Sequence, residues 1–88
     1  MAAEFQSQHE FIQEWRSSVG KAIRSRRQEL GLSQDELASM MEIQRSTISK
    51  VENGKFSFSI DYILRFAWYL KFEVKVGVKE WRYGRCTR

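Results

Sequence analysis

The fold is decided by residues 30–55, which read LGLSQDELASMMEIQRSTISKVENGK. Ser33 and Glu36 stand three residues apart, as in a capping box, where each side chain binds an unpaired backbone N–H at the start of a helix. Asn53-Gly54 closes the stretch, and both residues tolerate the positive φ that commonly ends a helix. The stretch therefore predicts two short helices joined by a turn.

The second of these helices, expected over residues 44–53, carries a narrow apolar stripe. Ile48 and Val51 are its only strongly apolar residues, so they must supply its buried side. The remaining positions form an outward face, because residues three and four apart lie on the same side of a helix. This outward face contains Arg45, Ser46, Ser49 and Lys50.

Three more helices are expected around this stretch. The first is an amphipathic helix in residues 3–17, and the second begins at Ser18 and ends at Gly31, where a glycine can take the left-handed conformation that closes a helix. The last begins near Ser59 and Asp61. Its core-facing row is expected to contain Ile60, Ile63, Leu64, Ala67 and Leu70.

The last helix carries a second apolar row, and a strand is predicted after it. The row contains Tyr62, Phe66 and Tyr69, and a helix that is apolar nearly all round is normally buried on both sides. After Lys71 the period changes to two, which is typical of a strand with one buried face. The alternating apolar residues of this strand are Phe72, Val74, Val76 and Val78.

A single strand leaves its backbone groups unpaired, so it needs a partner. We favour the same strand of a second protomer; the alternative is a hairpin at Gly77 that folds back onto residues 80–83. A two-chain ribbon lying over the aromatic row accounts for both features at once. The dimer interface is therefore expected to contain Tyr62, Phe66, Tyr69, Phe72, Val74, Val76 and Val78.

Two sequence blocks of the deciding stretch resemble a known family. LSQDELA and STISKVENG stand at the spacing found in the helix-turn-helix of the lambda-repressor and Cro-like regulators, called the XRE family. With the strand, the resemblance implies a mainly α protein, a five-helix lambda-repressor-like DNA-binding domain with one C-terminal β-strand pairing across a dimer. The expected divisions are an N-terminal amphipathic helix in residues 1–17, the helix-turn-helix domain in residues 18–70, and a strand with a basic tail in residues 71–88.

In this family the second motif helix lies in the major groove of DNA, which assigns roles to residues of both helices. Arg45 can donate two hydrogen bonds to guanine, and Lys50 can reach the same acceptors. The expected base contacts are Gln44, Arg45, Ser46, Ser49 and Lys50. The phosphate contacts implied by the resemblance are Gln34, Thr47, Asn53, Lys55 and Arg27.

Three features of the sequence affect which roles the family resemblance implies for its residues. Arg27 and Glu52 match a family pair in which the basic residue bridges the glutamate, so Arg27 is expected to be mainly structural. Glu42 stands at the turn position where glycine is common, and a side chain there costs energy if φ is positive. Gln44 replaces the usual serine or threonine cap, so the start of the second motif helix is less well defined.

The composition is compatible with an anionic binding partner. It does not favour a disulfide-bonded protein, a membrane protein or an enzyme. The net charge is +4 and the pI is near 9.5. Cys86 has no partner for an internal disulfide, and no apolar run approaches the roughly 18 residues that span a bilayer, so a cytoplasmic protein without a membrane anchor is expected. His9 stands alone, and no catalytic residue set, metal site or cofactor site is recognisable, so an enzyme is not expected.

The sequence therefore predicts a homodimeric regulator that binds double-stranded DNA at a palindromic operator and represses transcription. A narrower version adds a toxin protein as partner, because compact domains of this family resemble the antitoxins of toxin-antitoxin pairs. The alternative, from another class, is a protein-interaction module that keeps the helix-turn-helix scaffold without binding DNA. Arg45 and Lys50 argue against this alternative.

Overall fold

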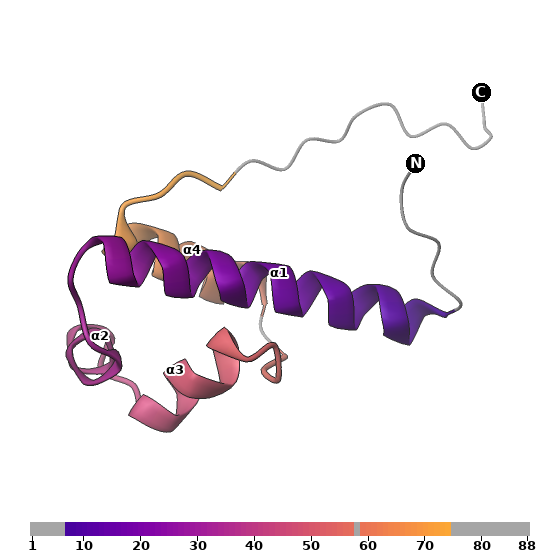
Figure 1. Ribbon diagram of the computed structural model, residues 1–88, viewed down its shortest axis with the longest axis horizontal. Coiled ribbons are helices and arrows are strands. Elements are labelled where there is room, and N and C mark those ends of the chain that lie inside the picture. The colour runs from indigo at the N-terminus through magenta and orange to yellow at the C-terminus, as the bar shows by residue number, and fades with distance from the viewer. Residues whose placement is uncertain (1–6, 58, 75–88) are drawn as a thin grey trace.

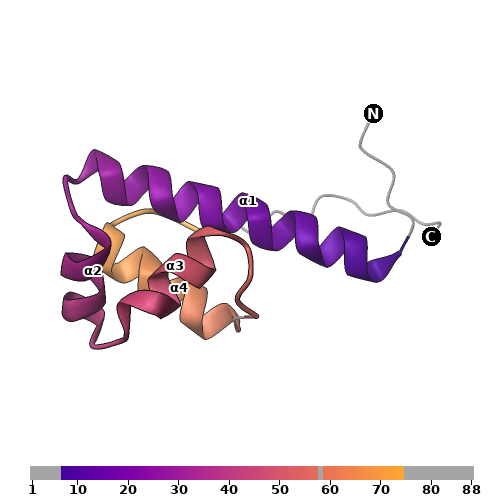
Figure 2. The same cartoon turned by 60° about the horizontal axis from the view of Figure 1, so that its bottom comes forward.

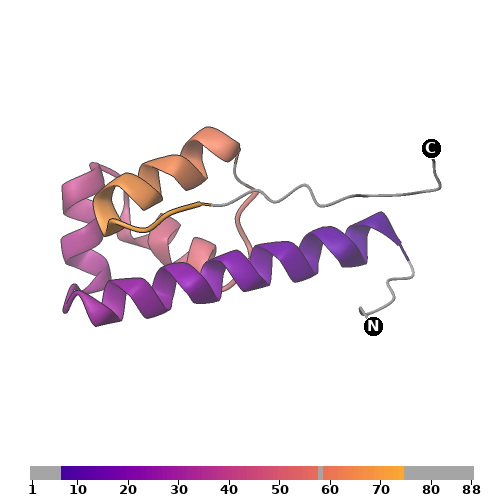
Figure 3. The same cartoon turned by 90° about the horizontal axis from the view of Figure 1, so that it is seen from above.

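The computed structural model describes residues 7–57 and 59–74, and these form four helices: α1 (Gln8–Glu29), α2 (Gln34–Met41), α3 (Arg45–Glu52) and α4 (Ile60–Leu70). α1 runs along the longest dimension of the molecule, with α2 and α3 on one side of it (Figure 1). The view in Figure 2 shows the first half of α1 projecting beyond the other helices. Seen from above, α1 and α4 form an upper layer over α2 and α3 (Figure 3). The predicted mainly α, helix-turn-helix fold is confirmed.

α1 is one continuous helix of 22 residues, where two helices were predicted. Its N-cap is Ser7, whose hydroxyl accepts a hydrogen bond from the backbone N–H of Glu10 at 3.2 Å. The predicted boundary at Ser18 was wrong, because a serine costs a helix interior only about 0.5 kcal/mol relative to alanine and no proline interrupts the run. The described part of the chain therefore holds four helices, not five. The predicted stop is confirmed, since Gly31 has a φ of 73°.

The hydrophobic core draws on all four helices. α1 contributes Ile23, and α4 contributes Phe66 and Leu70. Ile48 and Val51 of α3 are fully buried, as predicted from the apolar stripe. The complete set is Ile23, Leu37, Ala38, Met41, Ile48, Val51, Phe66 and Leu70. Each large apolar side chain contributes about 1.5–3 kcal/mol when it is fully buried, so the core determines which side of α3 faces outward.

Both apolar rows of α4 contribute to the chain's own core: Leu70 of the predicted inner row is fully buried, as expected, and Phe66 of the aromatic row is buried beside it. Phe66 is only 1% exposed, and Tyr62 and Tyr69 are half-buried against the same core. The ring of Tyr62 packs 5.6 Å from that of Phe66 and 5.3 Å from that of Phe56. Ile60, assigned to the inner row, is 69% exposed. Two apolar rows on one helix carry no periodic signal that separates inside from outside. Phe66 is therefore reassigned from the dimer interface to the core, whereas the assignment of Tyr62 and Tyr69 to that interface stays a prediction.

The chain after α4 is also held by the core. Lys71 has a φ of 57°, and this left-handed cap turns the chain back, so that the backbone N–H of Phe72 donates to an α4 carbonyl at 3.2 Å. Phe72 is consequently half-buried against the core, and its assignment to the dimer interface stays a prediction. No strand begins before the described segment ends, and Val74 is exposed there. Val76 and Val78 of the predicted strand lie outside the described residues.

α1 crosses α3 at a glycine. A Cβ added at Gly20 would overlap the carbonyl oxygen of Val51 and would lie 2.9 Å from that of Glu52. One turn before Gly20 on α1, the Cα of Ser17 would lie 3.0 Å from a Cβ added at Gly54. The two backbones therefore pack without a side chain between them, and this contact sets the distance between α1 and α3.

We predict that Gly20→Ala destabilises the fold by about 1–3 kcal/mol. Alanine is favoured over glycine in a helix by about 1 kcal/mol, but the added methyl group meets backbone that cannot move aside, so the clash outweighs this gain. Urea unfolding measures the change. Ser25→Ala, at an exposed position of the same helix, is the control and should leave stability unchanged or slightly higher. A Gly20→Ala variant as stable as the wild type would show that α1 and α3 do not approach this closely.

Candidate nucleic-acid interface

The turn between α2 and α3 is set by capping interactions. The Ser33 hydroxyl accepts from the Glu36 N–H at 3.0 Å, and the Glu36 carboxylate accepts from the Ser33 N–H at 2.7 Å, which confirms the predicted capping box. Glu42, after the end of α2, has a φ of 57°, a conformation that is unfavourable for a residue with a side chain. Arg65 of α4 donates to the carbonyl of Met41 at 3.0 Å. The turn is therefore held from α4 as well as from its own ends.

α3 presents a polar outer face, formed by Gln44, Arg45, Ser46, Ser49 and Lys50. Gln44 is the N-cap, but its side chain makes no capping hydrogen bond, and its oxygen instead accepts from the Ser46 hydroxyl at 3.3 Å. Arg45 and Lys50 are exposed, whereas Ser49 is half-buried. Because the opposite side of α3 is anchored in the core, these five side chains lie together on one surface, called here the α3 outer face.

Arg45 is paired with a carboxylate of the preceding helix. Its Nε lies 3.6 Å from Oδ1 of Asp35, which belongs to the first turn of α2. The helix dipole disfavours a cation such as Arg45 at the start of α3, and α3 has no acidic residue in its own first turn. The carboxylate of Asp35 therefore offsets the positive charge of Arg45. Both side chains are exposed, so the pair contributes about 0–1 kcal/mol and opens at little cost. Asp35 was not predicted, because no local pattern shows that the two helix starts lie close together.

A buried ion pair joins three helices behind the α3 outer face. The guanidinium of Arg27, on α1, donates through Nε and Nη2 to the Glu52 carboxylate of α3 at 2.6 and 3.1 Å. Its Nη1 donates to the carbonyl of Leu32 at 2.7 Å. The side-chain amide of Gln34, on α2, donates to the same carboxylate at 3.1 Å. The predicted bridge between Arg27 and Glu52 is thus present, and it includes α2 through Gln34.

Arg27 is a structural residue rather than a phosphate contact. It is 8% exposed, its partner Glu52 is 6% exposed, and all three guanidinium nitrogens are already engaged. With its guanidinium buried and held by Glu52 and Leu32, Arg27 presents almost no surface to a DNA phosphate. The assignment of Arg27 to phosphate, carried over from the family resemblance, is therefore corrected.

The other four residues assigned to phosphate border the α3 outer face. Gln34 stands at the start of α2, and Thr47 in the first turn of α3; both are half-buried. Asn53 and Lys55 are exposed beyond the end of α3. The Asn53 amide donates to a carbonyl in the last turn of α3 at 2.8 Å, so this side chain also closes the helix. These four residues lie around the α3 outer face, at both ends of α3. Their polar groups can contact the sugar-phosphate backbone of a DNA duplex that passes on either side of this face.

Arg26 of α1 has a structural role that the sequence did not reveal. Its Nε donates to the carbonyl of Leu70 at 2.9 Å, and its Nη2 donates to that of Lys71 at 3.2 Å. These carbonyls end α4, where a cation is stabilised by the helix dipole. The partners lie more than forty positions along the chain from Arg26, so a local pattern shows only a basic residue on a helix surface.

The described residues offer neither a metal site nor a membrane span. Within residues 7–57 and 59–74, no group of three or more His, Cys, Asp or Glu side chains is arranged to hold a metal ion. None of the helices in that part of the chain combines the length and the apolar character that a bilayer span requires.

Comparison with known proteins identifies the motif independently. A family model described as a helix-turn-helix matches residues 23–74, which is more than half of the chain. The matched span contains α2, α3 and α4 and only the last part of α1. No curated protein matches the chain. The projecting first half of α1 thus lies outside the matched motif.

Removing one member of the buried ion pair should cost far more stability than removing one member of an exposed pair. We predict that Arg27→Met lowers the free energy of unfolding by about 3–5 kcal/mol, because Glu52 is left buried without its cation. Adding Glu52→Leu should restore most of the loss. Urea unfolding measures both variants, and Asp35→Ala, the exposed control, should change stability by less than about 1 kcal/mol. A double variant no more stable than Arg27→Met alone would contradict this account of the pair.

Proposed function

Because the chain belongs to the lambda-repressor-like (XRE) family of helix-turn-helix DNA-binding transcription regulators, which are not enzymes, we propose that it binds a specific double-stranded DNA operator through the α3 outer face. The observation that carries the proposal is the position of two cations on that face. Arg45 and Lys50 are exposed, while the opposite side of α3 is anchored in the core by Ile48 and Val51. A rigidly seated helix with exposed donors is the element that a major groove accepts.

Each side chain of the α3 outer face has a distinct chemical role in this proposal. Arg45 leaves Asp35 and donates two parallel hydrogen bonds to O6 and N7 of a guanine. Lys50 reaches the same acceptors as a point charge, and Gln44 offers both a donor and an acceptor to an adenine. Ser46 and Ser49 bond to several base edges, so they add affinity with less discrimination.

The residues around the face bind the DNA backbone. We assign phosphate contacts to Gln34, Thr47, Asn53 and Lys55, which lie beside the start of α2 and both ends of α3. Such contacts fix the register of α3 on the duplex but carry no sequence information. Gln34 is held in place by Glu52, so the buried ion pair also positions one backbone contact.

A homodimeric repressor is the form of regulator that we propose. Two copies place their α3 helices in successive major grooves about 34 Å apart, so the operator is palindromic. Repression needs nothing beyond occupancy of a promoter by the dimer. The antitoxin version of this regulator stays a prediction from the sequence.

We predict that Arg45→Ala and Lys50→Ala each weaken binding to the selected operator by about 1–3 kcal/mol, because each removes a base contact. The operator is obtained by selection from random duplexes, and affinity is measured by fluorescence anisotropy at several salt concentrations. The control is Lys71→Gln, which removes one charge at the far end of α4. It should leave the preference for the operator over random duplex unchanged.

The same titrations distinguish DNA binding from a protein-interaction module. If Arg45→Ala and Lys50→Ala left both the affinity and its salt dependence unchanged, the α3 outer face would not be the DNA-binding surface. If the wild type showed no preference for any duplex over random sequence, the proposed function would be wrong and the interaction module would replace it.

A further inference from the structure

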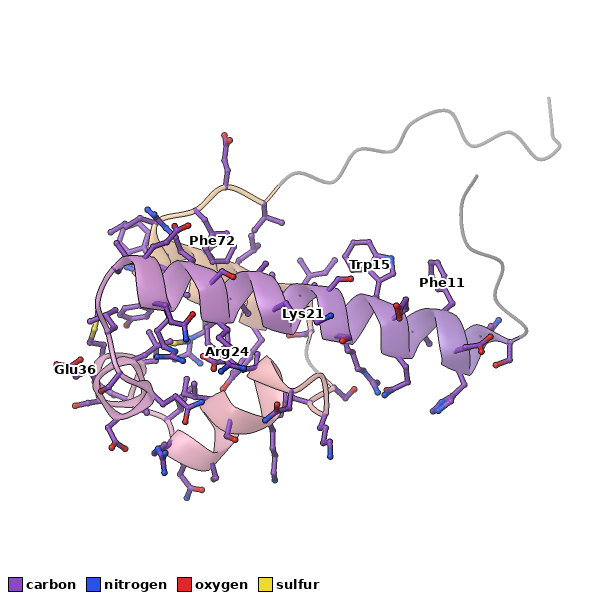
Figure 4. All side chains as sticks on the ribbon, viewed as in Figure 1. Phe11, Trp15, Lys21, Arg24, Glu36 and Phe72 are labelled. Carbon is purple, nitrogen blue, oxygen red and sulfur yellow. The ribbon has the colours of Figure 1, made fainter. Side chains whose placement is uncertain are left out.

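The first half of α1 has two chemically different sides. Figure 4 shows Phe11 and Trp15 projecting from the side of α1 that points away from α3. Arg16 stands on the other side, because it is four residues before Gly20, which packs against the backbone of α3. The carbonyl carbon of Arg16 would also lie 3.5 Å from a Cβ added at Gly54. Arg16 is therefore next to the chain that leaves the end of α3.

Arg16 is a half-buried cation that has no carboxylate partner among the described residues. Its Nη1 donates to the side-chain oxygen of Gln13 at 2.9 Å, so a neutral group orients the guanidinium. Within residues 7–57 and 59–74 the guanidinium forms no ion pair. A charge that is partly withdrawn from water without a compensating partner is suited to bind an ion of opposite sign.

Arg16 also lies beside residues to which we assign contacts with the DNA backbone. Gly54 is flanked in the sequence by Asn53 and Lys55, and both of these have proposed phosphate contacts. Because Gly54 packs directly on the backbone of α1, the phosphate-binding surface at the end of α3 borders α1.

The shape of a duplex brings its backbone towards α1 when α3 lies in the major groove. This groove is about 8.5 Å deep, so the phosphates of its walls rise beside a helix that lies at its floor. An α-helix is about 10 Å across, and α1 packs directly behind α3. The first half of α1 projects past the other helices (Figure 2), so its α3-facing side is open towards a wall of the groove.

We propose that Arg16 binds a phosphate of the DNA backbone and extends the DNA-binding surface from the α3 outer face onto α1. The inference rests on the proposed function, because it places the same helix in the same groove. It adds a contact from a part of α1 that lies outside the matched family motif. Glu10, one turn before Gln13, is negatively charged and would repel a phosphate, so the contact is confined to Arg16.

The first experiment measures how the affinity of the full chain for DNA depends on salt, both on the selected operator and on random duplex. Each phosphate contact contributes about 0.9 to the slope of log affinity against log salt, so Arg16→Gln should lower this slope by about 0.9. The loss of affinity between 50 and 200 mM salt should then be about threefold smaller than in the wild type. The preference for the operator should not change, because phosphate contacts carry no sequence information.

Two further variants separate a phosphate contact from a change in net charge or in packing. Lys71→Gln removes the same charge from an exposed residue at the far end of α4. Arg16→Lys keeps the cation and should retain most of the slope, and helical circular dichroism checks that every variant is folded. An Arg16→Gln variant with the slope of Lys71→Gln would overturn the inference. So would an Arg16→Lys variant as weak as Arg16→Gln, because the side chain would then act through packing.

The second experiment locates the contact by ethylation interference, in which an ethyl group on a contacted phosphate weakens binding. The wild type should show interference at one phosphate per bound chain that Arg16→Gln no longer shows, beside the phosphates assigned to Asn53 and Lys55. Identical patterns for the wild type and Arg16→Gln would overturn the inference.

The salt titration also separates this inference from the proposed function. A phosphate contact is independent of sequence, so a wild type that binds every duplex equally would overturn the proposed function while the slope of Arg16→Gln still tests the contact. A wild type that prefers its operator, with a slope that Arg16→Gln leaves unchanged, would overturn the inference alone. A wild type that binds no duplex would overturn both.

Discussion

The ion pair between Arg27 and Glu52 is the interaction on which the rest of the molecule depends. It joins α1 to α3 in the interior, and Gln34 extends it to α2, so the three helices that build the motif share one buried hydrogen-bond network. The glycine contact at Gly20 sets how closely α1 and α3 approach. With the inner side of α3 fixed in this way, the polar residues on its other side have a defined position and direction.

The helix-turn-helix could be predicted from the sequence because its signals are local. The capping box at Ser33, the glycine after α1 and the two apolar positions of α3 are each defined by a few neighbouring residues. The burial of Phe66 on α4 could not be predicted, because both rows of this helix are apolar and only packing against the other helices determines which side chains of each row enter the core. Likewise, Ser18 showed a possible helix start, but the packing of a continuous α1 on α3 determined the outcome.

The candidate site was likewise predictable only where its signals lie within a few neighbouring residues. The α3 outer face followed from the positions of Ile48 and Val51, whereas Asp35 beside Arg45 and the full engagement of Arg27 arise between residues distant in sequence. Family resemblance indicated that Arg27 bridges Glu52 but also assigned it to phosphate, and only the burial of its guanidinium separates these roles.

The proposed function requires α3 to enter the major groove and to contact base edges there. Methylation interference at guanine N7 on the selected operator tests it most directly, because N7 is exposed in the major groove and is an acceptor for Arg45 in this account. Interference is expected at guanines in two patches about 34 Å apart, on one side of the duplex. Binding that tolerates N7 methylation throughout the operator, or that is blocked only by modification in the minor groove, would contradict it.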